Sequence, residues 1–316
     1  DPAPIKRDVT LTPAVTSLYT SVPLRQENAV FAVGERSNAN GSKRFRELLS
    51  AEDWDALVSI GRDQIKEGSH ALDVCVAYVG RPEASDMAEV ISRYRGQITV
   101  PIMIDSTETP VLDAALKFLG GKSMINSINF EDGEERAEQV LGYAKKYGAA
   151  VVALTIDEEG MAKEVDRKLE LAHRIYDFAV NKHGLPASDL MFDPLTFTIC
   201  TGVEEDRNHG KNTLDAISRI AKELPECQIM LGLSNISFGL KPAARHVLNS
   251  VFLHHAQERG MTAAIIHVSK IMPLHKIDEA HREAADDLIF NHSRDGRDPL
   301  LYYVDLFKDV TSEAVK

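Results

Sequence analysis

Short apolar runs alternate with longer segments of helical periodicity along most of the chain. Eight of the runs have the length and continuous apolar character of strands that are buried on both faces of a parallel sheet. They are 29-AVFAV-33, 71-ALDVCV-76, 100-VPIMI-104, 123-SMINSI-128, 150-AVVALTI-156, 189-DLMF-192, 228-QIMLGL-233 and 263-AAIIHV-268. Eight strand–helix units over roughly 260 residues predict an α/β protein with a single (β/α)8 TIM barrel. A doubly wound open sheet is the alternative.

Helices are predicted between the strands, at 84–95, 109–119, 134–147, 163–182, 211–224, 242–259 and 279–290. A further helix is expected to begin at 50-SAED-53, which resembles a capping box. Apolar side chains from Trp54 to Ile65 then follow a helical face.

The barrel is predicted to occupy residues 29–290. Residues 1–28 are rich in Pro and Thr with little periodicity, and they are interpreted as an extended lead-in or linker. Residues 291–316 are interpreted as a C-terminal helix and a linker.

Composition narrows the classes of partner. The 316 residues include 36 Lys and Arg against 48 Asp and Glu, a net charge of −12, which argues against bulk binding to nucleic acid or to a membrane surface. No apolar run reaches the roughly 20 residues of a membrane span. The three cysteines are far apart and lack the spacing of a zinc site, so we expect reduced thiols, a cytoplasmic location and no metal bound by this chain.

Active sites of such barrels lie at the C-terminal ends of the strands. The candidate site residues at those ends are the polar residues Glu35, Asn38, Asp73, Asp105, Asn126, Asp193 and Asn235, together with Gly232. Each Asp or Asn alone is also suited to capping a helix. Together they suit either a divalent cation or a flat heterocycle such as a pterin. One carboxylate accepts from the 2-amino group and N3–H of a pterin, and an amide donates to its 4-oxo group.

Other polar residues near the strand ends are given supporting roles. Ser106, Ser127 and Ser234 are interpreted as caps or as supports of the site residues, and Arg36 is expected to form an ion pair with Glu35. His267, in the eighth run, and Lys270, just after it, are interpreted either as substrate contacts or as structural groups. The acidic segment 157-DEEG-160 is either a substrate contact or a solvated loop.

Six stretches carry a family resemblance when they are taken together in this order. They are 34-GERSNANGS-42, 103-MIDSTE-108, 124-MINSIN-129, 149-AAVVALTIDEEG-160, 192-FDPLTFTICTG-202 and 231-LGLSNISFGL-240. They resemble the folate-binding domains of cobalamin-dependent methionine synthases. That family falls within a wider class of pterin-binding barrels, which includes corrinoid-protein methyltransferases and dihydropteroate synthases.

The resemblance implies that the chain binds 5-methyltetrahydrofolate and positions its N5-methyl group for transfer to cob(I)alamin. The cobalamin is then held by another domain of the same longer chain. By motif, Asp105, Asn126 and Asp193 hold the pterin ring, and Asn235 hydrogen-bonds near N5 as the catalytic residue. Glu35, Asn38, Asp73 and Gly232 line the same pocket. No residue matches a strong general acid, so Asn235 is expected to deliver the proton through an extended network or water.

Two features of the methionine synthase family are missing from this sequence, which limits the expected function to part of the family's reaction. The chain has neither a cysteine cluster for a homocysteine-binding zinc nor the Asp-x-His-x-x-Gly motif of a cobalamin module. We therefore expect only the folate module, as a monomeric unit of a larger chain. A stand-alone corrinoid-protein methyltransferase, a dihydropteroate synthase and a non-catalytic folate-binding module remain the alternatives, and the LGLSN motif favours methyl transfer over the synthase.

Overall fold

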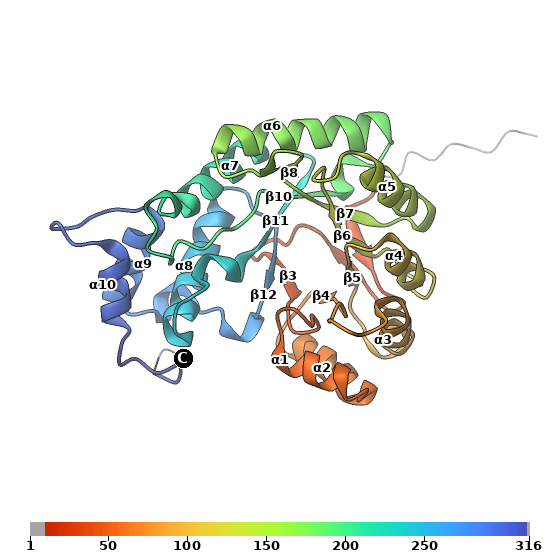
Figure 1. Ribbon diagram of the computed structural model, residues 1–316, viewed down its shortest axis with the longest axis horizontal. Coiled ribbons are helices and arrows are strands. Elements are labelled where there is room, and N and C mark those ends of the chain that lie inside the picture. The colour runs from red at the N-terminus through yellow and green to blue at the C-terminus, as the bar shows by residue number, and fades with distance from the viewer. Residues whose placement is uncertain (1–9, 315–316) are drawn as a thin grey trace, which may run out of the picture.

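Eight parallel strands close into a barrel in the computed structural model, which describes residues 10–314. Each strand pairs in parallel with its neighbours around the ring, and the closure lies between the last strand and the first (Figure 1). The strands are β3 (Phe31–Gly34), β4 (Ala71–Val74), β5 (Ile102–Asp105), β6 (Met124–Ile128), β7 (Ala150–Leu154), β10 (Leu190–Asp193), β11 (Gln228–Gly232) and β12 (Ala263–Ile266). The predicted barrel and all eight predicted strands are confirmed.

Helices surround the barrel and cover the outer faces of its strands (Figure 1). They are α2 (Trp54–Lys66), α3 (Glu83–Gln97), α4 (Thr109–Leu116), α5 (Glu135–Tyr147), α6 (Val165–Tyr176), α7 (His209–Glu223) and α8 (Pro242–Glu258). A π-helical turn, Asp177–Lys182, extends α6. Two C-terminal helices, α9 (Glu279–Ile289) and α10 (Pro299–Leu306), extend the structure beyond α8. The predicted C-terminal helix is therefore present.

The capping box predicted at 50-SAED-53 is wrong. Ser50 ends an unpredicted helix, α1 (Lys43–Ser50), and its Oγ donates to the carbonyl of Arg46 at 2.9 Å. The next helix, α2, is capped by Asp53, whose side chain accepts from the amide of Ala56 at 3.1 Å. Glu52 adopts a left-handed conformation with φ 55°, which breaks the helix between the two. The four residues therefore join two helices, and Asp53 instead of Ser50 caps the second.

The described part of the N-terminal segment closes the bottom of the barrel. Strands β1 (Ala14–Thr16) and β2 (Ser21–Pro23) pair as an antiparallel hairpin. Val15 and Leu24 are fully buried in one cluster with the inward-facing side chains of the barrel. The sequence predicted an extended segment here, but it did not predict that the segment would pair with itself and complete the core.

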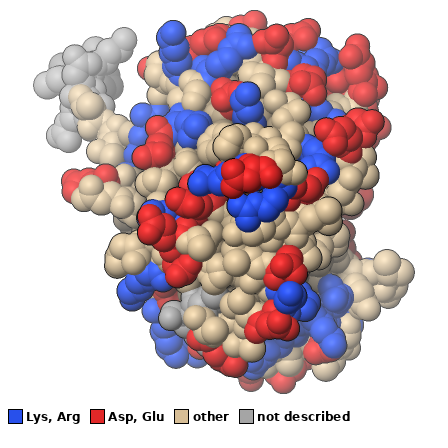
Figure 2. All heavy atoms as spheres, turned by 90° about the vertical axis from the view of Figure 1, so that its left-hand side faces the viewer, with Lys and Arg blue, Asp and Glu red and all other residues tan. Residues whose placement is uncertain are grey.

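The outer surface mixes both signs of charge. Figure 2 shows acidic and basic side chains interspersed over the face that carries α9 and α10, without a large area of one sign. Among the described residues, no helix is both long enough and apolar enough to cross a membrane.

The barrel-closing role of the hairpin region is testable by substituting Leu24. Leu24→Ala should lower the free energy of unfolding by about 2–5 kcal/mol, because it leaves a cavity in a fully buried site. Leu11→Ala is the matched control, since Leu11 is 78% exposed. Urea denaturation of both variants checks this, and an equal stability of the two would show that the segment is only a linker.

Candidate functional site

The polar strand ends are brought together by the alternation of side chains along each strand. One layer of the barrel interior is apolar, and a residue two positions further along a strand points the same way. The apolar layer contains Val33, Ala71, Met103, Met124, Met191 and Met230. The residues two positions on are Glu35, Asp73, Asp105, Asn126, Asp193 and Gly232. Six of the eight predicted site residues therefore occupy one layer at the C-terminal mouth of the barrel.

A cluster of two carboxylates and two amides lies on β4, β5, β6 and the loop after β3. The side-chain Nδ2 of Asn38 donates to Asp73 Oδ2 at 2.8 Å and to Asp105 Oδ2 at 2.9 Å. The Nδ2 of Asn126 donates to Asp73 Oδ1 at 3.5 Å. These three hydrogen bonds to the carboxylates thus come from side-chain amides, and none of them comes from a cation.

Burial without a paired cation changes the ionisation of this cluster. Burial raises the pKa of Asp73 well above its ordinary value, and repulsion from Asp105 raises it further. Burial raises the pKa of Asp105 to about 6, against the opposing effect of the hydrogen bond from Asn38. The two carboxyls therefore favour a ligand that brings hydrogen-bond donors to them.

The loop after β3 is held from below by Gln64 of α2. Gln64 Oε1 accepts from the backbone amide of Arg36 at 2.8 Å, and its Nε2 donates to Ser37 Oγ at 3.0 Å. A Cβ atom at Gly34 would lie only 2.5 Å from the same Oε1, so a side chain there would displace the support. This support fixes the backbone from which Asn38 reaches the two carboxylates.

The predicted ion pair between Arg36 and Glu35 is wrong. The Arg36 guanidinium instead pairs with Glu67 of the loop after α2 at 2.6 Å. Glu35 accepts from Ser234 Oγ at 2.9 Å, and burial raises its pKa. The reason is the strand alternation: adjacent residues on β3 and its extension point to opposite sides, so Glu35 faces the barrel mouth and Arg36 faces α2.

A second group surrounds Asp193 on the opposite side of the mouth. Asp193 Oδ1 accepts from the amide of Leu195 at 2.8 Å, and burial raises the pKa of Asp193 to about 6. A backbone hydrogen bond from Gly232 lowers that pKa in part. A Cβ at Gly232 would lie 3.3 Å from Asn235 Nδ2, so the glycine leaves room for the amide.

Asn235 itself is exposed on a 3-10 turn, Leu233–Ser237. The turn is held by Arg245 of α8, which donates to the carbonyl of Ser234 at 3.0 Å and to Ser237 Oγ at 3.1 Å. The hydrogen bond from Ser234 to Glu35 fastens the turn to the barrel. An exposed amide on a rigid turn is accessible to a ligand in the mouth and to a second molecule above it.

Two cavities flank these groups. The larger has a volume of about 790 Å³, within the range of small-molecule sites, and is lined by Asp105 and Asn126. Its rim is fixed by Arg136 of α5, which donates to the carbonyls of Thr107 at 2.7 Å and Ser127 at 2.9 Å. The smaller cavity, of about 160 Å³, is lined by Glu35, Arg245, His267 and Lys270, and burial lowers the pKa of His267 to about 4.

Comparison with known proteins shows the family to which the chain belongs. A family model described as pterin binding enzyme matches residues 34–267. The chain belongs to the pterin-binding enzyme family. It is 50% identical to methionine synthase of Mycobacterium leprae over 314 residues, which is 98% of this chain and 26% of that protein. It is 48% identical to methionine synthase of Mycobacterium tuberculosis over the same shares. The chain thus spans about a quarter of the length of these relatives.

Solved structures show the same fold at low identity. Dihydropteroate synthase from Xanthomonas albilineans, with 4-aminobenzoic acid, superposes with a TM-score of 0.59 at 20% identity, covering 83% of this chain and 94% of that one. The enzyme from Stenotrophomonas maltophilia gives a TM-score of 0.58 at 17% identity, over 94% and 96% of the two chains. These matches support the barrel architecture of the pterin-binding family.

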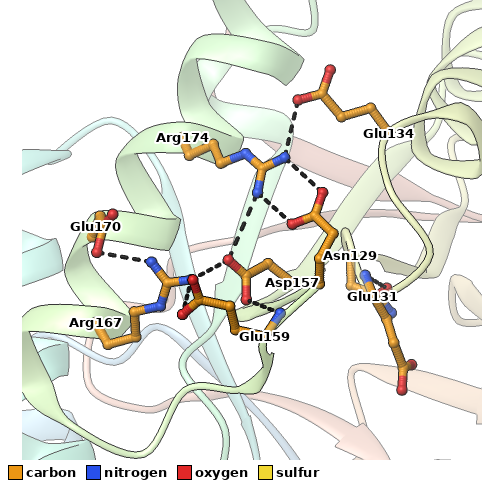
Figure 3. A network of polar contacts seen from close by, with 9 residues as sticks. Asn129, Glu131, Glu134, Asp157, Glu159, Arg167, Glu170 and Arg174 are labelled. Carbon is orange, nitrogen blue, oxygen red and sulfur yellow. Dashed lines mark hydrogen bonds and ion pairs between the residues drawn. The ribbon is translucent and has the colours of Figure 1, made fainter.

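The acidic segment of this pterin-binding barrel is exposed at Glu158 and Glu159, as expected of a solvated loop, but not at Asp157. Asp157 lies on the hairpin β8 (Ile156–Asp157) and β9 (Gly160–Met161), is buried, and pairs with Arg167 and Arg174 of α6 (Figure 3). Arg174 also contacts Glu134 at 3.2 Å. The network fastens the hairpin after β7 to α6. Within residues 10–314, no three His, Cys, Asp or Glu side chains are grouped to hold a metal ion.

Sequence reasoning missed Arg136, Arg245 and Gln64, which hold the loops of the pterin-binding barrel in place. All three lie on helices, where a polar residue has the same appearance in sequence whether it faces solvent or a loop above it. The predicted supporting serines do lie at the mouth: Ser106 Oγ donates to Glu83 at 2.6 Å, in addition to the contact of Ser234 with Glu35.

Because the pKa values of these carboxyls are raised, we predict that the free energy of unfolding decreases as the pH rises through the acidic range. A carboxyl whose pKa is higher in the folded than in the unfolded state holds a proton that the unfolded chain has lost, so stability falls as pH rises from about 4 to about 6. Asp105→Asn should flatten this decline and raise the free energy of unfolding at pH 7 by about 1–3 kcal/mol. Chemical denaturation at pH 4.5 and 7 measures it.

Asp113→Asn is the control for this experiment. Lys117 and Tyr147 hold the pKa of Asp113 below its ordinary value, so its contribution is present at neutral pH and lost on acidification. The control should therefore lower stability at pH 7. A loss of stability at pH 7 in Asp105→Asn as well would contradict the assignment of Asp105 as a destabilising buried charge.

Proposed function

We propose that this chain binds 5-methyltetrahydrofolate at the C-terminal mouth of the barrel and positions its N5-methyl group for transfer to cob(I)alamin carried by another domain. The chain would thus act as the folate domain of a cobalamin-dependent methionine synthase, a methyltransferase half-reaction. The observation that carries the proposal is the layer of inward-facing carboxylates and amides, in a chain half identical to a methionine synthase and matched by the pterin-binding family model.

The ring-binding role suits the hydrogen-bonding capacity of Asp105, Asn126 and Asp193. A pterin presents its 2-amino group and N3–H side by side, and one carboxylate accepts from both, while its 4-oxo group needs a donor such as the Asn126 amide. Carboxyls with a pKa of about 6 ionise readily when such donors approach. A ring without matching donors would leave them buried and unpaired, at a cost of about 1–3 kcal/mol per group. In this proposal Asn38, Asp73, Glu35 and Gly232 complete the pocket.

Methyl transfer from a tertiary amine requires N5 to become a better leaving group, which protonation achieves. Cob(I)alamin, when presented by its own domain, supplies the nucleophile. The chain's own task is to hold the ring and to favour positive charge at N5. Asn235 suits this role because its amide oxygen accepts from N5–H⁺ and its turn is fixed by Arg245 and Ser234. The negative carboxylates nearby also stabilise the cation, and Asn235 with an extended network or water delivers the proton.

The exposure of Asn235 supports reaction with a second domain. The Asn235 side chain is exposed on the turn at the barrel mouth, where a second domain can contact it. The share of the relatives that the chain covers, about a quarter, supports a partner domain in a longer protein. A cytoplasmic location is part of the proposal and rests on the three free cysteines.

Asn235→Ala separates binding from catalysis. Added cob(I)alamin should demethylate 5-methyltetrahydrofolate in the presence of the parent chain. The variant should reduce the rate by about 10²-fold or more, with a much smaller change in folate affinity, because the contact strengthens only as N5 acquires a proton. Loss of the cobalt(I) absorbance measures the rate.

The control is Asn181→Ala, since Asn181 lies on the π-helical turn after α6 and its amide bonds Asp177 instead of facing the mouth. It should retain the parent rate. Folate binding without any methyl transfer by the parent would favour a non-catalytic folate-binding module. A full rate in Asn235→Ala would remove Asn235 from the mechanism.

A further inference from the structure

Lys168 is a lysine with no exposed surface, and the mechanism above does not use it. It lies on α6, and its Nζ donates to the carbonyls of Pro194 and, at 3.4 Å, of Leu195. The Nζ also lies 5.0 Å from the centroid of the Phe197 ring. Burial lowers the pKa of Lys168 to about 8. A buried ammonium group is costly to desolvate, so its place beneath the loop after β10 needs a structural or functional reason.

Lys168 and Thr213 clamp the turn that follows Asp193. Leu195 has φ 69°, a left-handed conformation that costs a non-glycine residue about 1–2 kcal/mol. Its carbonyl accepts from Lys168 Nζ on α6 and from Thr213 Oγ1 on α7, the latter at 2.8 Å. Two helices thus hold one carbonyl, and the strained turn persists because its surroundings fix it.

Leu195 is also hydrogen-bonded to the site carboxylate, Asp193. The amide of Leu195 donates to Asp193 Oδ1 at 2.8 Å. The carbonyl of Pro194, which accepts from Lys168 Nζ, lies in the same planar peptide unit as this amide, and the contacts to the Leu195 carbonyl hold the other end of the residue. Lys168 therefore controls the orientation of the Asp193 carboxylate through one intervening peptide unit.

Lys168 also acts on Asp193 through charge. The positive charge of Lys168 and the amides of Leu195 and Gly232 oppose the rise that burial causes in the pKa of Asp193. Around Lys168, Asp193 and Glu164 at the start of α6 favour the ammonium form. On α7, burial lowers the pKa of His209, and the charge of Lys168 acts in the same direction.

The other basic residues of α6 have different partners. Arg167 and Arg174 pair with the acids of the β8–β9 hairpin, as Figure 3 shows. The cation that α6 directs to the loop after β10 is thus Lys168.

We propose that Lys168 is a positioning residue for substrate binding, which holds the Asp193 carboxylate in its ring-binding orientation and keeps it negatively charged. The proposal rests on the proposed function, because it assumes that Asp193 accepts from the pterin ring. It adds a residue outside the pocket to the determinants of pterin affinity.

Two variants separate charge from orientation. Lys168→Met removes both the clamp and the charge, whereas Thr213→Val removes one hydrogen bond to Leu195 and leaves the charge. The affinity for 5-methyltetrahydrofolate is measured by calorimetry from pH 5 to pH 8. Thr213→Val should weaken binding by a similar factor at every pH.

Lys168→Met should weaken binding and also move the acid midpoint of the affinity profile to higher pH, by about 0.5 unit or more. The sign follows from the loss of a cation, which raises the pKa of Asp193 and protonates it at a higher pH. If Lys168→Met fails to fold, the Lys168→Met/Leu195→Gly variant replaces it, since glycine adopts the left-handed turn without strain. An unchanged midpoint in the folded variant would overturn the proposal, and so would unchanged affinity in Thr213→Val.

A ligand-free measurement distinguishes this failure from failure of the proposed function. Carbon-13 NMR titration of the Asp193 carboxyl in the parent and in the Lys168 variant reports its pKa directly. An equal carboxyl pKa in the two proteins would overturn the role of Lys168 whether or not folate binds. A raised carboxyl pKa in the variant, together with no folate binding by the parent, would support the electrostatic link and contradict the proposed function instead.

Discussion

The site depends on burying carboxylates at the barrel mouth with amides, not cations, as their nearest partners. The inward layer below is apolar, so Asp73 and Asp193 are buried where their strands end, and Asp105 is half-buried at the wall of the larger cavity. Asn38 joins two of these carboxylates through one amide nitrogen. The desolvation that raises their pKa values also makes them strong acceptors for any ligand that brings donors in the right geometry.

Maintaining such a site requires support from the surrounding helices. Gln64 of α2 fixes the loop after β3, Arg136 of α5 ties together the loops after β5 and β6, and Arg245 of α8 holds the turn that carries Asn235. Lys168 of α6 supports the turn after β10 in the same way. The strands place the site residues, and polar side chains of the helical layer hold the loops after β3, β5, β6, β10 and β11. This division gives a rigid pocket on loops that are otherwise free to vary.

The sequence was sufficient to predict the barrel and the composition of the inner layer. Eight continuous apolar runs predicted eight strands, and the two-residue period explains why Glu35, Asp73, Asp105, Asn126 and Asp193 meet. It did not predict which polar residues of the helices hold the loops, because the sequence pattern around a buried lysine such as Lys168 is the same as that around an exposed one. It also gave the wrong partner for Arg36 and a false capping box at Ser50, because tertiary contacts and the backbone conformation of Glu52 decide both.

The most direct test is calorimetric titration of 5-methyltetrahydrofolate into the parent chain and into Asn126→Ala, with the exposed-turn variant Asn181→Ala as control. The account predicts saturable binding with one site in the parent and in the control, and affinity at least about tenfold lower in Asn126→Ala, since a buried ring acceptor loses its donor. Equal affinity in all three proteins would place the folate away from the polar layer at the barrel mouth. No binding by the folded parent would contradict the central claim that this layer is a folate site.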